Sequence, residues 1–401
     1  MNKSLLIFSL YTGYFLVGIV ALIFAPIMPI MIRDFDITLG IAGIIFPAYS
    51  IGSFTGVLLG GILSDITGKK TLIIVGSILQ AIGLALIPIV SSWAIVLGIF
   101  SVMGLGRGFL NTCINAFVAD INPRRRGAAL NALHGVYGIG SLIGPLIIGL
   151  LLTFQYSWKL IYFGVAGIWI VYIIVNIFLK YPTTEHMKKF EIKMDALKAI
   201  ISSRVFILLF LISFIYNGAA TGLVGWINTY MDQMKYPALF GASMVSVFYL
   251  GLTLGRFICS YLSDRLGYSK TILACAIGSF IFYPLTIFTS SPVTIALGVF
   301  FSGLFFSGLH PTGLAYANTM FSSISGTITG LLSAAMSLGA MSIPWLIGFV
   351  SEYSSFKSGL SIGYILVTVL VCVAVILILK ERREKRIIKL KNKKEGVSNC
   401  M

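Results

Sequence analysis

Polar side chains recur at helical spacing inside otherwise apolar sequence. In GLGRGFLNTCIN, Arg107, Asn111 and Asn115 stand at positions i, i+4 and i+8, so a helix places all three on one face. One guanidinium and two amides can donate and accept hydrogen bonds, but they supply neither a nucleophile nor a general base. This face therefore suits reversible binding of a small polar solute better than bond-breaking chemistry.

Other ionisable and polar residues lie within similar apolar runs. His134 and Tyr137, three residues apart, form part of a second polar face. The further candidates for solute contact are Asn217, Trp226, Arg256 and His310. A polar side chain inside a membrane is costly and marks a functional site by default. Two structural alternatives stay open: asparagines that only join helices, and arginines that pair only with backbone carbonyls.

The composition places these residues in a membrane. Of the 401 residues, 58% are hydrophobic and only 10% are charged, and the mean hydropathy is +0.98. Soluble domains carry about 25% charged residues, and a spanning helix needs about 20 apolar ones. We therefore predict an all-α membrane protein with twelve transmembrane helices. Their approximate ranges are 6–32, 41–63, 71–90, 94–119, 128–154, 159–180, 204–230, 241–262, 271–289, 293–318, 326–350 and 359–379.

The net charge of +16 follows the membrane rather than a nucleic acid. With alternating spans and a cytoplasmic N-terminus, 23 of the 29 Lys and Arg residues fall on the cytoplasmic side and four on the other. The remaining two are the mid-span Arg107 and Arg256. This positive-inside bias predicts a multi-pass protein of the cell membrane with both termini in the cytoplasm. We expect no nucleic-acid partner.

The chain repeats itself with a constant shift of 199 residues. Asp65 corresponds to Asp264, and Gly52 corresponds to Gly251. Each repeat holds six spans, so the two bundles keep the same orientation and are related by a pseudo-twofold axis along the membrane normal. The predicted parts are a six-helix bundle over 1–180, a cytoplasmic linker with a short amphipathic helix over 181–203, a second six-helix bundle over 204–379, and a basic cytoplasmic tail over 380–401.

The stretch LLGGILSDITGKK, residues 58–70, lies between the second and third predicted spans, and SDRLG repeats part of it between the eighth and ninth. It resembles the cytoplasmic motif of the major facilitator superfamily, roughly G-x-L-x-D-x-x-G-[RK]-[RK]. The resemblance covers the whole chain and implies two pseudo-symmetric six-helix bundles that alternate access to a central site. It also implies gating residues, namely Gly61, Asp65, Gly68, Lys69, Asp264 and Arg265. We expect Asp65 at the positive N-terminus of the eleventh span, near Ser325.

Helices four and five carry a narrower resemblance. GFLNTCINAFVAD and RGAALNALHGVYGIGSLIGPLIIG look like the corresponding helices of the fucose–proton symporter family and its sugar-transporting relatives. This resemblance implies that His134 and Arg256 border a sugar site. The chain departs from the family where an acid is usual: Asn111 and Ala220 occupy two such positions, and the first span has no acid. Either a histidine such as His310 carries a coupling proton, or the protein is a uniporter or exchanger.

Several functions remain open. The resemblance favours a sugar or related polyol, whereas two arginines without a buried carboxylate favour an organic anion. Export of amphipathic drugs is a third alternative, and a receptor or scaffold on the same fold is a fourth. We expect no enzyme activity, because no nucleophile–base pair is present, and no cofactor or metal, because the five cysteines lack ligand spacing. The expected partners are lipid, the solute and a coupling proton or other ion, and the expected state is a monomer.

Overall fold

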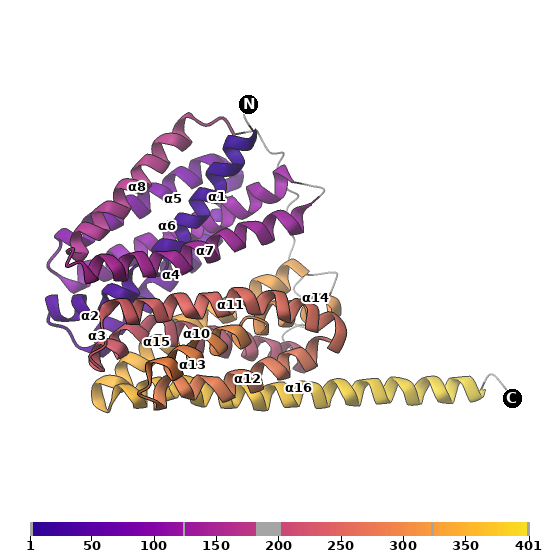
Figure 1. Cartoon of the computed structure of the whole chain (residues 1–401). Helices are drawn as coiled ribbons and strands as arrows, with labels where there is room; N and C mark the ends of the chain where they lie inside the picture. Colours follow the sequence, from indigo (N-terminus) through magenta and orange to yellow (C-terminus); the bar gives the residue numbers. More distant parts are fainter. Residues whose placement is uncertain (1–2, 123–124, 182–201, 322–324, 399–401) are drawn as a thin grey trace.

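The computed structural model describes residues 3–122, 125–181, 202–321 and 325–398, and its regular structure is helical throughout (Figure 1). Among these residues, twelve helical segments are long and apolar enough to cross a membrane. The prediction of twelve spans is therefore confirmed. Six of them precede the segment 182–201 and six follow it.

The helices of the first half are α1 (Lys3–Val20), α2 (Phe24–Asp34), α3 (Leu39–Gly43), α4 (Ile45–Thr67), α5 (Lys69–Leu86), α6 (Trp93–Ile121), α7 (Arg126–Thr153) and α8 (Trp158–Phe178), with a short 3-10 turn at Ile87–Ile89. Those of the second half are α10 (Arg204–Gln233), α11 (Ala238–Leu266), α12 (Tyr268–Phe288), α13 (Pro292–Phe306), α14 (Leu309–Met320), α15 (Ser325–Tyr353) and α16 (Phe356–Ser398).

Three spans that the sequence predicts as continuous, the first, second and tenth, are each built from two helices, and proline explains two of these breaks. Pro26 and Pro311 have no N–H to donate to the carbonyls of Leu22 and Ser307, four residues earlier. The chain accordingly breaks between α1 and α2 and between α13 and α14. Interrupted helices of this kind often mark the binding site of a transporter.

The predicted tail is part of a long helix, and most of the predicted linker lies outside the described residues. The helix α16 continues as one element past its predicted span end at 379 to Ser398, so the first part of the predicted tail extends a membrane helix. The predicted amphipathic linker over 181–203 falls, except for its ends, outside the ranges that the structure describes. Its helix stays a prediction.

The two halves repeat the same close packing at the predicted offset. A Cβ on Gly52 would lie 1.9 Å from the carbonyl oxygen of Ser101, and a Cβ on Gly251 would lie 2.1 Å from that of Phe300. Both glycines and both carbonyls are related by the same shift of 199 residues. Because glycine has no side chain, the backbone of α4 can approach that of α6, and the backbone of α11 can approach that of α13.

The turns at Gly68 and Gly267 also repeat at the offset of 199 residues. Gly68 ends α4 with φ +86° and Gly267 ends α11 with φ +83°. Their N–H groups donate to the carbonyls of Ser64 at 3.0 Å and Ser263 at 3.1 Å. Because this backbone conformation favours glycine, both copies of the motif keep it at the turn.

The close approach of α4 to α6 leads to a stability prediction. Gly56→Val is expected to destabilise the protein by about 1–3 kcal/mol or more, because a Cβ there would lie 2.2 Å from the carbonyl oxygen of Leu105. Gly61→Val, on the same helix, is the matched control, since a Cβ at Gly61 meets no atom within 4 Å. Thermal unfolding in detergent compares the two, and equal midpoints would contradict the packing explanation.

The two halves touch at one end and diverge toward the other (Figure 1). We call the end that holds α2, α3 and the end of α15 the contact end, and the end where α1 begins and α4 and α14 stop the divergent end. Contacts between halves are made by α2 with α10, α3 and α4 with α15, and α7 with α11. The polar mid-span residues lie between these ends.

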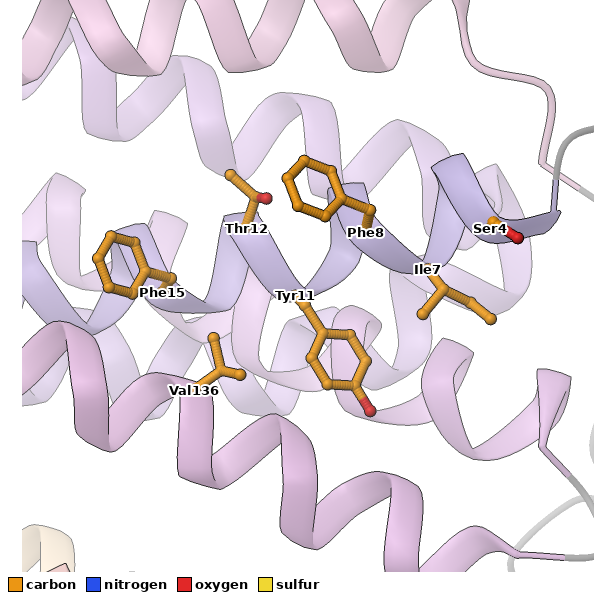
Figure 2. Close-up of a pocket in the computed structure, with 7 residues that line it drawn as sticks. All are labelled: Ser4, Ile7, Phe8, Tyr11, Thr12, Phe15 and Val136. Atoms are coloured by element: carbon orange, nitrogen blue, oxygen red, sulfur yellow. The ribbon is translucent and has the colours of Figure 1, made fainter.

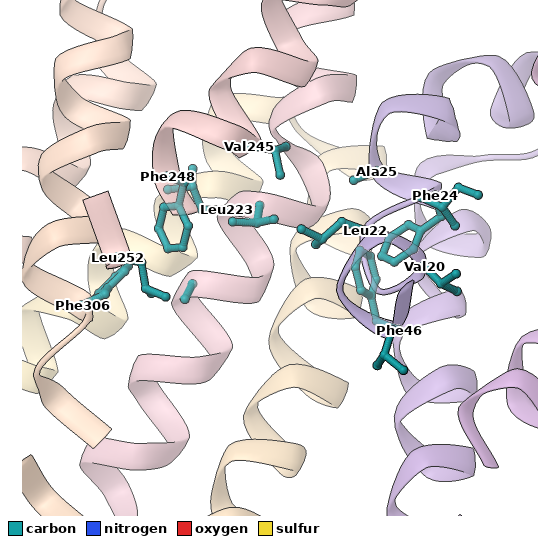
Figure 3. Packing of buried hydrophobic residues seen from close by; sticks show 14 of the residues in the cluster. Val20, Leu22, Phe24, Ala25, Phe46, Leu223, Val245, Phe248, Leu252 and Phe306 are labelled. Carbon is teal, nitrogen blue, oxygen red and sulfur yellow. The ribbon is translucent and has the colours of Figure 1, made fainter. Parts of the chain in front are cut away.

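Large apolar side chains seal the contact end. Phe46 of α4 packs against Trp226 of α10 with ring centroids 5.8 Å apart, and Phe24 of α2 packs against Phe46 at 5.5 Å. A Cβ on Gly225 would lie 2.5 Å from the Phe46 ring, so this glycine makes room for it. Figure 3 shows buried side chains of both halves in this region. We call this cluster of apolar side chains at the contact end the apolar seal.

Candidate functional site

Arg107 sits in the middle of α6 and is held by aromatic side chains. Its Nη2 donates to the hydroxyl oxygen of Tyr137 at 3.3 Å, and its guanidinium carbon lies 5.5 Å from the centroid of the Tyr49 ring. A guanidinium over an aromatic face is attracted by the π electrons. Neither contact supplies a negative charge, so Arg107 remains a cation without an acidic partner among the described residues.

Asn111 and Asn115 belong to a hydrogen-bond network centred on Tyr14 of α1. The Tyr14 hydroxyl donates to Asn111 Oδ1 at 2.6 Å and accepts from Asn115 Nδ2 at 3.0 Å. Asn115 Nδ2 also donates to the carbonyl oxygen of Asn111 at 2.7 Å. The network fixes both amides while leaving Asn111 Nδ2 and Asn115 Oδ1 for other partners, because no described residue bonds to them. The two predicted candidates therefore combine helix packing with spare binding capacity.

The second half carries a corresponding pair. Ser213 Oγ of α10 lies 3.3 Å from His310 Nδ1 of α14. Ser213 and His310 occupy the positions that the shift of 199 residues assigns to Tyr14 and Asn111. Asn217, one turn further along α10, donates through Nδ2 to the carbonyl oxygen of Met336 at 2.8 Å. Both halves thus present polar groups at equivalent places.

Arg256 and His134 lie at matching levels of the two helices that join the halves. Ser246 of α11 donates to the carbonyl oxygen of Leu142 in α7 at 2.6 Å, and a Cβ on Gly138 would lie 3.5 Å from Thr253 Oγ1. Continuing along these antiparallel helices brings His134 opposite Arg256.

Both of these residues are exposed. The ring of His134 lies edge-on to Tyr14 with centroids 5.4 Å apart, and the ring of Tyr137 lies 5.5 Å from the same tyrosine. The predicted residues therefore stand on helices that contact one another in sequence, α6, α7, α11 and α14, and they are Arg107, Asn111, Asn115, His134, Tyr137, Arg256 and His310. We call this set, together with Tyr14, the polar centre.

Trp226 does not belong to the polar centre, contrary to the prediction. Its side chain has 0% exposure and lies in the apolar seal, where Nε1 donates to the carbonyl oxygen of Pro344 at 2.7 Å. A Cβ on Gly348 would lie 2.5 Å from its ring. An indole with its only donor satisfied by backbone packs the two halves together and has no free group for a solute.

The predicted gating motif lies at the divergent end. Lys69 forms an ion pair with Asp120 at the end of α6, within its own half. Gly61 faces open space, and Asp65 is exposed and bonds to no described residue. Its expected neighbour, Ser325, begins α15, but the surroundings of that side chain lie outside the described part. The contact of Asp65 with α15 stays a prediction.

The second copy of the motif is similarly open. Asp264 is exposed near the end of α11, and the guanidinium of Arg265 lies over the ring of Tyr261, 4.5 Å from its centroid. These contacts stay within one helix. In this conformation neither copy of the motif links the two halves through a contact between described residues.

Two acidic side chains near helix ends join the two halves. Across the contact end, Arg33 pairs with Asp232 at 2.6 Å, and the two are 199 residues apart, the offset of the repeat. Glu352 accepts from the N–H of Gly40 at 2.9 Å, which also joins the two halves. Within the spans the described acids stand near the ends of their helices.

A separate groove of about 570 Å³ lies along α1 and is lined by Ser4, Ile7, Phe8, Tyr11, Thr12, Phe15 and Val136 (Figure 2). None of the predicted site residues lines it. Tyr11 within it donates to the carbonyl oxygen of Ala129 at 3.0 Å. The groove is mostly apolar and is not part of the polar centre.

The sequence prediction missed three members of the site. Tyr14, Tyr49 and Ser213 contact predicted residues but stand in apolar runs without a polar stripe of their own. The repeat offset could have found two of them, because it pairs Tyr14 with Ser213 and Asn111 with His310.

Comparison with known proteins agrees with this architecture. A family model described as Major Facilitator Superfamily matches residues 10–247 and 237–399. The chain is 23% identical over 390 residues to the glucose/mannose transporter of Bacillus subtilis (strain 168), covering 94% of each chain. It is 25% identical over 334 residues to the cis,cis-muconate transport protein of Acinetobacter baylyi, covering 77% of this chain and 79% of that one.

A crystal structure of the nucleoside transporter NupG is similar in fold, with a TM-score of 0.78 and 13% identity over 94% of this chain and 99% of that one. The twelve spans, the duplicated turns and the family match lead to one conclusion. The chain belongs to the Major Facilitator Superfamily and is a secondary transporter, not an enzyme.

Proposed function

We propose that the protein moves a small polar organic solute, a sugar or a close chemical relative, across the cell membrane by alternating access. The observation that carries this proposal is the polar centre. Hydroxyl, amide and imidazole groups of both halves stand midway along the spans, and an apolar seal lies toward the contact end. Groups of this kind bind hydroxyls, and their division between two halves lets one motion switch their access.

The relatives support a sugar as the first class to test. A glucose/mannose transporter aligns over nearly the whole chain, and helices four and five resemble those of the fucose–proton symporter family. His134 and Arg256, which this resemblance assigns to the sugar site, both face the polar centre. The proposal carries these two roles over to this chain.

The charge distribution supports an orientation for the structure. Most described basic residues near helix ends, such as Lys3, Lys69 and Arg204, lie at the divergent end, which the positive-inside bias assigns to the cytoplasm. Under this assignment both termini are cytoplasmic and the structure is the inward-facing state. Closure of the divergent end and opening of the contact end would then give the outward-facing state.

The coupling ion is proposed from the absence of acids in the polar centre. His134 and His310 are the histidines of the polar centre, and histidine is a residue type that carries protons in proton relays. Proton coupling through them, uniport and exchange remain distinct versions of the proposal. Uptake into liposomes with and without a pH gradient distinguishes proton coupling from the other two.

The experiment that tests the function is a thermal-shift screen of the purified protein, followed by uptake of each hit into liposomes. The panel contains neutral hexoses, sugar acids, dicarboxylates and amphipathic drugs. Uptake of a sugar or sugar relative is expected. Uptake confined to drugs, or no uptake of any small solute, would contradict the proposal.

An organic anion is the second candidate, because Arg107 and Arg256 meet no acid among the described residues. One of the relatives is named as a transport protein for cis,cis-muconate, which is an organic anion. Dicarboxylates in the same screen test it directly.

The Tyr14 network gives a prediction about affinity. Tyr14→Phe is expected to raise the KM for the transported solute about tenfold, because Asn111 and Asn115 lose the hydroxyl that orients them. Tyr11→Phe on the same helix removes a hydroxyl that bonds to a backbone carbonyl outside the polar centre, so it serves as control. Initial uptake rates give the KM of both variants. A KM of Tyr14→Phe equal to that of the parent protein would show that the network does not contribute to solute binding.

A further inference from the structure

We propose that the solute carries a carboxylate, held jointly by Arg107 of the first half and Arg256 of the second, so that the substrate class is hydroxylated carboxylic acids such as sugar acids rather than neutral sugars. This inference rests on the proposed function and specifies the solute for the same polar centre. Its basis is the charge, the position and the free donors of the two arginines.

The two positive charges are not neutralised by the protein. Neither Arg107 nor Arg256 forms an ion pair with a described residue, and the described acids of the spans lie near helix ends. Holding a cation inside a membrane protein is costly unless a partner or water compensates it. Arg107 is half-buried and has only the Tyr137 hydroxyl and the Tyr49 ring as partners among the described residues, so a carboxylate would compensate a charge that a neutral sugar would not.

The two arginines face a common region. Arg107 lies on α6 of the first half and Arg256 on α11 of the second, and both helices contact α7. The contacts agree: Arg107 bonds to Tyr137, the ring of Tyr137 packs beside Tyr14, and Tyr14 packs beside His134, which stands opposite Arg256. The proposal places one ligand between these two side chains.

Both guanidiniums have donors to spare. Arg107 uses its Nη2 toward Tyr137 and its planar face toward Tyr49, while Arg256 is exposed and bonds to no described residue. No backbone carbonyl of a described residue accepts from either one, so the purely structural explanation for them loses its support. A planar fork of N–H donors matches a carboxylate in shape and charge.

The remaining polar groups suit hydroxyls. Asn115 Oδ1 and Asn217 Oδ1 accept from no described residue, although both side chains are fixed through their amide nitrogens. Fixed acceptors of this kind can take O–H donors of a ligand. A carboxylate between the arginines and hydroxyls toward these amides describe a polyhydroxy acid.

Calorimetric titration of the full-length protein in nanodiscs tests this proposal, with D-gluconate, D-glucuronate and D-glucose as ligands. We expect at least one acid to bind about tenfold or more tightly than glucose. Arg107→Gln and Arg256→Gln should each remove that preference, whereas Lys159→Gln should keep it. Lys159 is an exposed cation on α8 outside the polar centre, so it controls for the loss of one positive charge.

The outcomes separate this inference from the proposed function. Glucose binding equal to that of the acids, unchanged by both arginine variants, would overturn the carboxylate site while leaving sugar transport standing. Binding of neither class in the full screen would overturn both. If Arg107→Gln does not fold, Arg256→Gln decides, because its side chain is exposed and supports no packing in this state.

Discussion

Gly149→Leu is expected to prevent the two halves from meeting at the contact end and to reduce transport about 100-fold or more. Gly149 of α7 faces α11 of the other half, where an added Cβ would lie 2.4 Å from the Cβ of Ala242 and 3.3 Å from the Cα of Leu239. Leucine adds three more carbons at a place where backbones already touch. A carrier that cannot close one end cannot complete its cycle.

Two measurements on Gly149→Leu test this prediction, one of the transport rate and one of the conformation. Solute uptake into liposomes gives the rate, and distances between spin labels on α2 and α10 give the conformation, which should shift toward separation at the contact end. Gly164→Leu on α8 is the matched control, because a Cβ there meets no atom within 4 Å. Transport at the wild-type rate with unchanged distances would show that the halves need not approach at this level.

Asp65→Asn is expected to lower transport about tenfold while leaving expression and thermal stability unchanged. Asp65 makes no bond to a described residue in the present state, so its charge is not needed here. In the opposite state the divergent end closes, and a carboxylate at the N-terminus of α15 would contribute about 0.3–1 kcal/mol, up to about 2 kcal/mol when partly buried. Removing that charge disfavours one state only.

Labelling of a cysteine placed in the polar centre, by a reagent that enters only from the divergent end, measures the population of the two states. The reagent should react faster in Asp65→Asn than in the parent. Asp36→Asn is the control, since Asp36 has a positive φ that asparagine also tolerates and lies near the contact end. A variant with normal transport and unchanged labelling would refute the gating role of this motif.

The fold was predictable because its determinants are local and repeated. Runs of apolar residues located the twelve spans, and the shift of 199 residues located pairs such as Gly68 and Gly267, whose backbone conformation depends on a few neighbours. Helix breaks at Pro26 and Pro311 were equally readable from proline chemistry, although the sequence prediction treated those spans as continuous.

The site was predictable only in part, because its contacts join distant segments. Spacing placed Asn111 and Asn115 on one face, but their partner Tyr14 comes from a helix almost a hundred residues earlier. Tryptophan often binds sugars, so its residue type favoured a site role for Trp226. Its burial depends on Phe46 of α4 and Pro344 of α15, which contact it only in the folded protein. Lys69 likewise pairs with Asp120, an acid that no motif connects to it.

The ion pair between Arg33 and Asp232 has a consequence for the history of the chain. These two residues occupy the same place in each repeat, so their bridge spans the pseudo-twofold axis. In a dimer of two identical ancestral halves, the residue at this place would have faced its own copy, and equal charges repel. Opposite charges could meet there only after the copies began to differ in sequence. The bridge therefore postdates their divergence, unlike the glycine turns, which the two copies still share.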